Sequence, residues 1–321
     1  MKMQKRHKLI RLMLTLSWVG ILLGFWLTSP GWAKEKYEEK FQKSVALAQE
    51  GKVEIRNVSG DIRVFVWEKN EVKIEAVKIS RASSLEKAKE NAARVKIEVT
   101  KEDDTLTIAT RYPKTTFKRL DVSVNYKVTI PTKAALRVKS VSGDVECGHI
   151  GGFLKISAVS GDVVVEQAGD GVELSSVSGD VKISRIEGEA SLKTVSGDIS
   201  IAFLRGSVEA ESVSGDIELK DVSQARRVKV SSLSGDVRYY GDLNPDGIYT
   251  LKTHSGDLEV RLPAEAKFDL VAKTFSGDVD SEFEITLVGK VSRRELRGKV
   301  NGGGAELELR TFSGEIKLRK K

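Results

Sequence analysis

The residue that could most clearly do chemistry is an aspartate that recurs after Ser-Gly along the chain. If these triplets stack, neighbouring carboxylates about 4.8 Å apart in water repel by only about 0.9 kcal/mol, so a column of them is tolerable. Such a column could bind divalent cations, although one carboxylate per corner supplies few of the oxygens that Ca²⁺ takes. We expect instead that the side chains close a corner by accepting hydrogen bonds from amides. The weaker alternative, a cation site, has as candidate ligands Asp144, Asp162, Asp180, Asp198 and Asp216.

Two other sets of residues could support catalysis. Cys147 and His149 lie two positions apart on an expected strand, where they could share a face as a nucleophile and its base. A free thiol packed as a small apolar group is the alternative that we favour. His254 is an odd residue in a column otherwise held by Val, Leu or Phe, and no partner acid can be placed beside it. We therefore assign no catalytic residue, no metal and no cofactor.

A possible binding loop surrounds the turn at 244–247, which reads Asn-Pro-Asp-Gly. Tyr239, Tyr240 and Tyr249 flank it, and aromatic side chains on a loop of a rigid scaffold suit sugar or protein contacts. The alternative is a turn whose aromatic side chains only cover the edge of the fold.

An internal repeat sets the positions of these residues along the chain. From Gly143 to Gly215 the glycines of the triplet are 18 residues apart, and the later intervals are 20, 21, 21 and finally 37 residues. The last interval would hold two coils, one of which has lost its triplet. A fixed period near 20 residues is typical of stacked repeats. The glycines are Gly60, Gly143, Gly161, Gly179, Gly197, Gly215, Gly235, Gly256 and Gly277, with Gly314 in a final Ser-Gly-Glu copy.

The residues around each glycine predict two short strands per coil. Apolar side chains recur five and two positions before the glycine and two after it, a small residue stands three before it, and the intervening residues are mostly charged or serine. This alternation favours strands, because a helix would need apolar residues three and four apart. One coil cannot bury its apolar side chains alone, whereas stacked coils can. We therefore predict an all-β fold, a β-solenoid of coils of about 18–21 residues.

After residues 1–33, the chain divides into three expected segments. Residues 34–50 are a polar lead-in, residues 51–134 form an N-terminal β-rich region, and residues 135–321 form the repeat domain. A helix is expected near 84–96, with Ser83 or Ser84 as its cap, inside an inserted or capping element. Strands are expected at 95–100, 104–110 and 120–130.

Residues 1–33 have the layout of a signal peptide, with a basic start, an apolar run and small residues before position 34. An uncleaved membrane anchor over residues 9–29 is the alternative, since about 18 apolar residues can span a bilayer. Either way, the rest of the chain is expected to be exported, to the periplasm or the cell surface. The leader carries five of the 53 basic residues and no acid, so the remaining chain has 48 basic and 46 acidic residues. This balance argues against nucleic acid as a partner.

The repeats resemble a bacterial family of unknown function whose members are described as "putative adhesins". The resemblance covers residues 50–321, and its most specific parts are the serial Val-Ser-Gly-Asp-Val copies and the ending at 302–314. Thr129-Ile130-Pro131 resembles the family's entry into its repeats. The helical stretch and the lost triplet depart from the pattern. The resemblance implies an extracytoplasmic β-solenoid and supplies no catalytic residues.

We therefore expect a non-enzymatic module of the cell envelope that acts in adhesion, ligand binding or structure, with an unknown protein or polysaccharide as its partner. One alternative is a carbohydrate-active or acyl-transferring enzyme on a β-helix. The 18-residue period would fit three hexapeptides, but apolar residues do not recur at every sixth position around the coil. Another alternative is an accessory protein of envelope stress or signalling.

Overall fold

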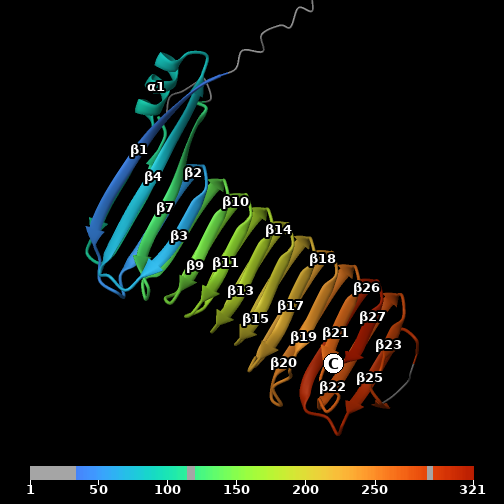
Figure 1. Ribbon diagram of the computed structural model, residues 1–321. Coiled ribbons are helices and arrows are strands. Elements are labelled where there is room, and N and C mark those ends of the chain that lie inside the picture. The colour runs from blue at the N-terminus through green and yellow to red at the C-terminus, as the bar shows by residue number, and fades with distance from the viewer. Residues whose placement is uncertain (1–33, 114–119, 288–291) are drawn as a thin grey trace, which may run out of the picture. The chain divides into compact units, whose positions relative to one another are not determined.

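The computed structural model describes residues 34–113, 120–287 and 292–321. The expected signal peptide or anchor at 1–33 lies outside the described residues. Nearly all the described secondary structure is β-strand, and the strands form two long sheets that face each other (Figure 1). The all-β solenoid predicted from the repeats is confirmed.

In spatial order, the fourteen-stranded sheet contains β24 (Thr286–Leu287), β25 (Glu295–Val300), β22 (Phe268–Ser276), β26 (Ala305–Ser313), β20 (Ile248–Ser255), β18 (Arg227–Ser234), β16 (Val208–Ser214), β14 (Ala190–Ser196), β12 (Val172–Ser178), β10 (Leu154–Ser160), β8 (Ala135–Ser142), β2 (Lys52–Ser59), β6 (Thr105–Arg111) and β5 (Lys96–Glu102). The thirteen-stranded sheet contains β1 (Glu35–Ala46), β4 (Glu71–Ala82), β7 (Val122–Pro131), β3 (Ile62–Trp67), β9 (Val145–Ile150), β11 (Val163–Ala168), β13 (Val181–Glu187), β15 (Ile199–Arg205), β17 (Ile217–Ser223), β19 (Val237–Gly241), β21 (Leu258–Leu262), β27 (Ile316–Lys320) and β23 (Val279–Ser281).

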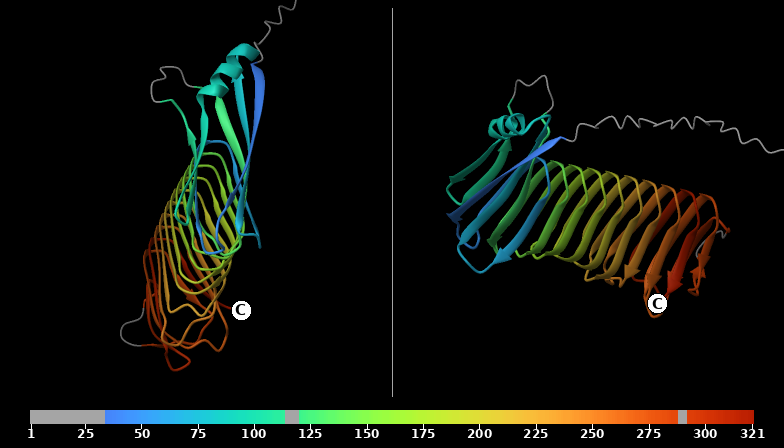
Figure 2. Two further views of the ribbon diagram at one scale, coloured as in Figure 1. Left: turned by 90° about the vertical axis from the view of Figure 1, so that its left-hand side faces the viewer. Right: turned by 45° about the horizontal axis from the view of Figure 1, so that its top comes forward.

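Each repeat contributes one strand to each sheet. The chain runs along a strand of the fourteen-stranded sheet, turns at Ser-Gly-Asp, returns along the thirteen-stranded sheet and turns again into the next coil (Figure 2). Equivalent residues of successive coils pair in parallel and in register, as Ile156 with Leu174 and Leu174 with Leu192. The predicted arrangement of two strands per coil is therefore confirmed.

The glycine of each corner is required by both backbone angle and space. Gly197 has a φ of 134°, a conformation that side-chain-bearing residues rarely adopt. A Cβ at Gly197 would also collide with the carbonyl oxygen of Gly179 on the neighbouring coil. The same collision with the neighbouring corner recurs along the stack, so the close approach of successive corners depends on glycine.

The core is a single aliphatic interior between the two sheets. It is built from the column five residues before each glycine and from the columns two and four residues after it, such as Leu192, Ile199 and Ile201 in one coil. Fully burying such a side chain contributes about 1.5–3 kcal/mol. Each coil that is added therefore extends the same apolar interior.

Antiparallel strands close the N-terminal end of the stack. The polar segment expected as a lead-in forms β1, which pairs with β4, and β4 pairs antiparallel with β7. The helix α1 (Leu85–Arg94) packs on β1 and β4, and its cap is Ser84, whose hydroxyl accepts a hydrogen bond from the N–H of Lys87. The helix and the three strands expected after it are confirmed. No helix in the described part of the chain is long and apolar enough to cross a membrane.

The C-terminal end corrects the prediction that the 37-residue interval holds an extra coil. The chain instead turns back after β23, and β25 pairs antiparallel with β22. The final coil, β26 and β27, then inserts between the coil of β20 and β21 and the coil of β22 and β23. The spatial order of the last two coils is thus the reverse of their order in the sequence.

Candidate functional site: an apolar ridge along the Ser-Gly-Asp corners

One apolar column predicted from the repeats faces solvent rather than the interior. The residue two positions before each corner glycine is exposed, with 40–64% of the surface of the Val, Leu and Phe members accessible. We call this column the apolar ridge. In spatial order it contains Val58, Val141, Val159, Val177, Val195, Val213, Leu233, His254, Phe312 and Phe275.

The direction of the ridge follows from the alternation of side chains along a strand. Leu192 and Thr194, five and three positions before Gly197, point into the core, so Val195 must point outward. Parallel register then places each ridge residue beside its equivalent on the next coil. The outward direction could be predicted from the sequence. The small residue three before the glycine points into the core, so the ridge residue that follows it points to solvent.

The C-terminal end of the ridge is aromatic. The ring of His254 stacks on that of Phe312 with centroids 4.8 Å apart, and Phe312 stacks on Phe275 at 4.7 Å. His254 is exposed, so it does not interrupt the core. It belongs to the apolar ridge on the surface, where its ring continues the row of stacked aromatic side chains.

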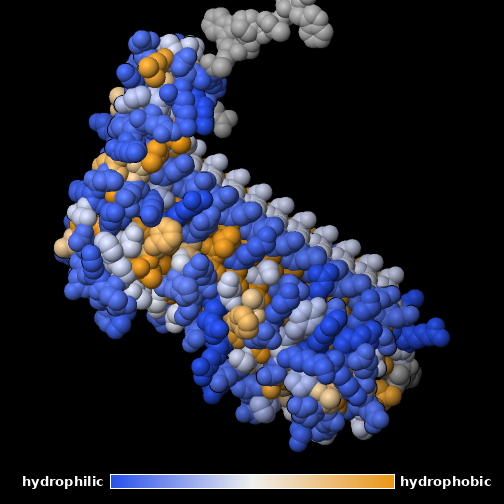
Figure 3. Space-filling model, in the orientation of Figure 1, coloured by the Kyte–Doolittle hydropathy of each residue, from blue (hydrophilic) through white to orange (hydrophobic). Residues whose placement is uncertain are grey.

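Charged rows of opposite sign flank the ridge. On the fourteen-stranded sheet, the position four before the glycine is basic in six of ten coils, serine in three and acidic only in Glu211. We call its cations the basic row: Arg56, Lys139, Lys193, Lys252, Arg310 and Lys273. Beyond the corner lies the acidic ladder: Asp61, Asp144, Asp162, Asp180, Asp198, Asp216, Asp236, Asp257, Glu315 and Asp278. Along the edge of the stack that Figure 3 shows, a regular row of residues of intermediate hydropathy borders a mostly hydrophilic face.

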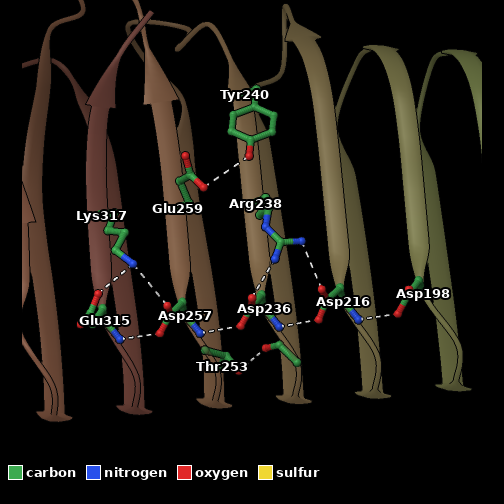
Figure 4. Close-up of polar contacts among 11 residues, drawn as sticks. Asp198, Asp216, Asp236, Arg238, Tyr240, Thr253, Asp257, Glu259, Glu315 and Lys317 are labelled. Atoms are coloured by element: carbon green, nitrogen blue, oxygen red, sulfur yellow. Dashed lines mark hydrogen bonds and ion pairs between the residues drawn. The ribbon is translucent and has the colours of Figure 1, made fainter.

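The acidic ladder closes the corners by hydrogen bonding. The N–H of Asp236 donates to Oδ1 of Asp216 at 2.8 Å, and the N–H of Asp257 donates to Oδ1 of Asp236 at 2.9 Å (Figure 4). The pattern extends without interruption from Asp61 to Glu315. Below the corner, the hydroxyl of Thr253 donates to the carbonyl of Gly235 at 2.9 Å. These contacts agree with the corner-closing role that we expected for Asp.

Cations neutralise part of the ladder on its outer side. Arg238 lies 3.1 Å from Asp216 and 2.8 Å from Asp236, and Lys317 bridges Asp257 and Glu315 (Figure 4). Within residues 34–113, 120–287 and 292–321, no group of three or more His, Cys, Asp or Glu side chains is placed to hold a metal ion. Cation binding by the ladder remains the weaker alternative.

The tyrosines of the expected binding loop lie mostly in the core. Tyr239 and Tyr249 are fully buried and meet edge to face, with ring centroids 5.9 Å apart. The hydroxyl of Tyr249 donates to the carbonyl of Ala225 and accepts from the N–H of Asn244, both at 2.7 Å, so it fixes the turn. Only Tyr240 reaches the surface, where the guanidinium of Arg261 lies over its ring. Binding through this loop remains a prediction that rests on Tyr240.

Cys147 and His149 do not share a face. Cys147 is buried in the column of Val165 and Ile183, whereas His149 is exposed, with Nδ1 3.0 Å from Oε2 of Glu166. The strict alternation fails here, because the next inward residue is Ile150. Burial raises the pKa of the Cys147 thiol to about 12, which disfavours a thiolate. The two residues are therefore not placed to act as a nucleophile and its base.

The sequence matches one described family of proteins. The family model described as Toastrack DUF4097 matches residues 51–242 and 242–319. No curated protein matches the sequence.

Three solved structures are similar over most of the chain. A "putative adhesin" of Bacteroides fragilis is 15% identical, with 87% of this chain and 97% of that chain covered and a TM-score of 0.36. A "putative lipid binding protein" of Parabacteroides distasonis is 12% identical, with 88% and 97% covered and a TM-score of 0.39. A "putative cell adhesion protein" of Clostridium sporogenes is 10% identical, with 89% and 100% covered and a TM-score of 0.27.

Proposed function

The chain belongs to the Toastrack DUF4097 family, and from this premise we propose that it is an exported, non-enzymatic, adhesin-like module of the cell envelope that binds through its apolar ridge. Export is inferred from the leader at 1–33. The observation that carries the binding role is the ridge, because soluble proteins rarely expose long continuous apolar strips unless these contact a partner or a membrane.

The stack makes the ridge a rigid surface. Each coil is held to its neighbours by parallel ladders in both sheets and by the acidic ladder at the corner. Side chains at the ridge are thus presented at a spacing of about 4.8 Å with little freedom left to lose on binding. A rigid repetitive surface suits a long or repetitive ligand.

The free energy gained by covering the ridge is enough for a contact of weak to moderate affinity. Covering the exposed half of one aliphatic ridge residue gains about 1 kcal/mol, so the whole ridge gains on the order of 10 kcal/mol. Association costs about 4–15 kcal/mol in lost freedom. The balance predicts weak to moderate affinity for one copy and strong attachment only when many copies act together.

The test compares two double variants of the full chain that add the same charge. Val177→Asp with Val195→Asp places two carboxylates on the ridge. Ser184→Asp with Ser200→Asp places two on the outer face of the thirteen-stranded sheet, on the same two coils. All four positions are at least partly exposed, so each substitution should change stability by about 0.5 kcal/mol or less.

Binding is measured by co-sedimentation of each purified chain with envelope fragments from cells that lack it. We expect the ridge variant to lose about tenfold or more in affinity, which corresponds to 1.4 kcal/mol, while the control binds like the unmodified chain. Equal binding by all three chains would show that the ridge is not the binding surface.

A further inference from the structure

The two charged rows beside the apolar ridge point to the partner that the ridge accepts. The basic row lies on one side of the ridge, with a cation in six of the ten coils, and the acidic ladder lies on the other. Any partner that covers the ridge must therefore present negative charge on one side and positive charge on the other. A second copy of this chain carries both rows at the required spacing.

The order of the rows also selects the orientation of the second copy. A two-fold axis parallel to the stack places the ridges side by side, with the basic row of each copy against the acidic ladder of the other. A two-fold axis across the stack makes the copies antiparallel and sets basic row against basic row and acidic ladder against acidic ladder. Like charges across an interface are unfavourable, so the parallel arrangement is the complementary one.

Four of the six cations of the basic row are available for such contacts, whereas Arg56 and Lys139 both pair with the nearly buried Glu54. Lys193 lies 3.0 Å from Glu211, and Lys252 lies 3.2 Å from Glu308, but these ion pairs are on the surface. Surface pairs contribute about 0–1 kcal/mol, so they can be exchanged for contacts with a partner at little cost. Four rungs do not contribute such a pair, because serine replaces the cation in three coils and Glu211 stands opposite the ladder residue Asp216.

The size of the surface matches a stable interface. Ten rungs spaced about 4.8 Å apart give a strip about 48 Å long. The five steps along the chain from the basic row to the acidic ladder span at most about 17 Å of extended chain. The strip thus approaches the roughly 800 Å² that each partner buries in a standard interface.

We propose that two copies of this chain associate side by side and in parallel through the apolar ridge, with the basic row of each copy on the acidic ladder of the other. This inference rests on the proposed binding role of the ridge and adds a second copy as a partner, which would compete with the envelope ligand for the same surface. Both copies then present Lys34 at the same end, so the association joins chains that emerge from one surface.

The test is disulfide formation between single-cysteine variants of the full chain in the cells that export it, after a mild oxidant is added. In the parallel arrangement, equivalent rungs face each other, so Val177→Cys and Leu233→Cys should each form a dimer with themselves. In an antiparallel arrangement centred on the ridge, each position lies about 14 Å from its own equivalent along the stack, too far for a disulfide. There, Val177→Cys would link only to Leu233→Cys in a mixture of the two.

Ser184→Cys, on the outer face of the other sheet, is the matched control, and the native Cys147 is buried and does not compete. We expect about tenfold more covalent dimer from each ridge variant than from the control, because only ridge positions lie within disulfide reach. Links formed only in the mixture would overturn the parallel arrangement. No link above the control in any sample would overturn the second copy as partner.

The two proposals fail in distinguishable ways. Loss of envelope binding by Val177→Asp with Val195→Asp, without any cysteine link, would leave the binding role intact and remove self-association. Self-links together with unchanged envelope binding by that variant would support self-association and remove the envelope ligand from the ridge.

Discussion

The backbone N–H of Asp216 donates a 2.8 Å hydrogen bond to Oδ1 of Asp198, the equivalent residue one coil earlier. On either side of Asp198, the N–H groups of Gly197 and Ile199 donate forward, to the carbonyls of Ser214 and Asp216 on the next coil. The N–H of Asp198 itself points the other way along the stack, and a side-chain oxygen of the preceding coil accepts its hydrogen bond. Asp at this position therefore completes the hydrogen bonding that the tight corner interrupts.

Removing one carboxylate of the ladder should weaken the stack modestly. Asp198→Ala deprives the amide of Asp216 of its acceptor and should cost about 0.5–1.5 kcal/mol in unfolding free energy. Asp198→Asn keeps an oxygen at the same position and should stay within about 0.5 kcal/mol of the unmodified chain. Urea denaturation measures both, and equal losses for the two variants would show that charge, and not the acceptor, matters.

A methyl group at a corner glycine should be far more costly. Gly197→Ala forces a positive φ on alanine and drives its Cβ into the carbonyl of Gly179, so a loss of about 3 kcal/mol or more is expected. Gly302→Ala is the control, because Gly302 also has a positive φ but open space around its Cβ position. Its loss should be about 1 kcal/mol, from backbone strain alone. Comparable thermal stabilities for the two variants would contradict the close approach of the corners.

The contacts at the expected binding loop predict losses of different size for two tyrosines. Tyr249→Phe leaves the N–H of Asn244 and the carbonyl of Ala225 without their shared partner and should cost about 1–3 kcal/mol. Tyr240→Phe removes only a 3.5 Å contact with Glu259 at a partly exposed position and should cost less than about 0.5 kcal/mol. A larger loss at Tyr240 than at Tyr249, measured by thermal unfolding, would contradict the placement of the two rings.

The buried thiol predicts a dependence of stability on alkaline pH. Burial raises the pKa of Cys147 from 9.0 to about 12, so the folded chain keeps the proton after the unfolded chain has lost it. Its contribution is therefore complete below about pH 9 and is lost as the pH rises toward 12, by up to about 1.4 kcal/mol per pH unit.

Cys147→Val is the control for this effect, because Val and Ile already occupy the same column in neighbouring coils. Tyr126 also has its pKa raised to about 12 by burial and adds to the alkaline loss in both chains, so the difference between the two chains isolates the thiol. Parallel stability curves from pH 8 to 11 would mean that the thiol ionises freely.

The repeat predicted the fold because one residue per coil, the corner glycine, sets both the turn and the period. The helix at Leu85–Arg94 was predictable from its serine cap and from Ala88 and Ala92 on one face. The outward direction of Val195 was missed because Val is apolar wherever it points. Its direction follows only from the alternation of side chains along the strand, because Leu192 and Thr194 point into the core.

Other features depend on contacts that no local pattern carries. The insertion of β26 and β27 before the coil of β22 and β23 accompanies the antiparallel pairing of β25 with the other edge of β22. Tyr249 could not be distinguished from a surface aromatic, because its burial depends on packing against Tyr239 and on the backbone of Ala225. The alternation of inward and outward side chains likewise breaks after Cys147. Cys147 and His149, which a regular strand would place on the same face, therefore lie on opposite faces.

The stack itself is tested most directly by spin-label distances on the outer face of the thirteen-stranded sheet, with labels on cysteines at Lys182, Lys317 and Asp280 taken in pairs. Strand order places Lys317 five strands from Lys182 and Asp280 six, so their backbone separations should be about 24 and 29 Å. Position 317 is thus expected to be the nearer of the two, although it is later in the sequence. A shorter distance from 182 to 280 than from 182 to 317 would mean that the coils stack in sequence order and would contradict the continuous ridge described for this end of the stack.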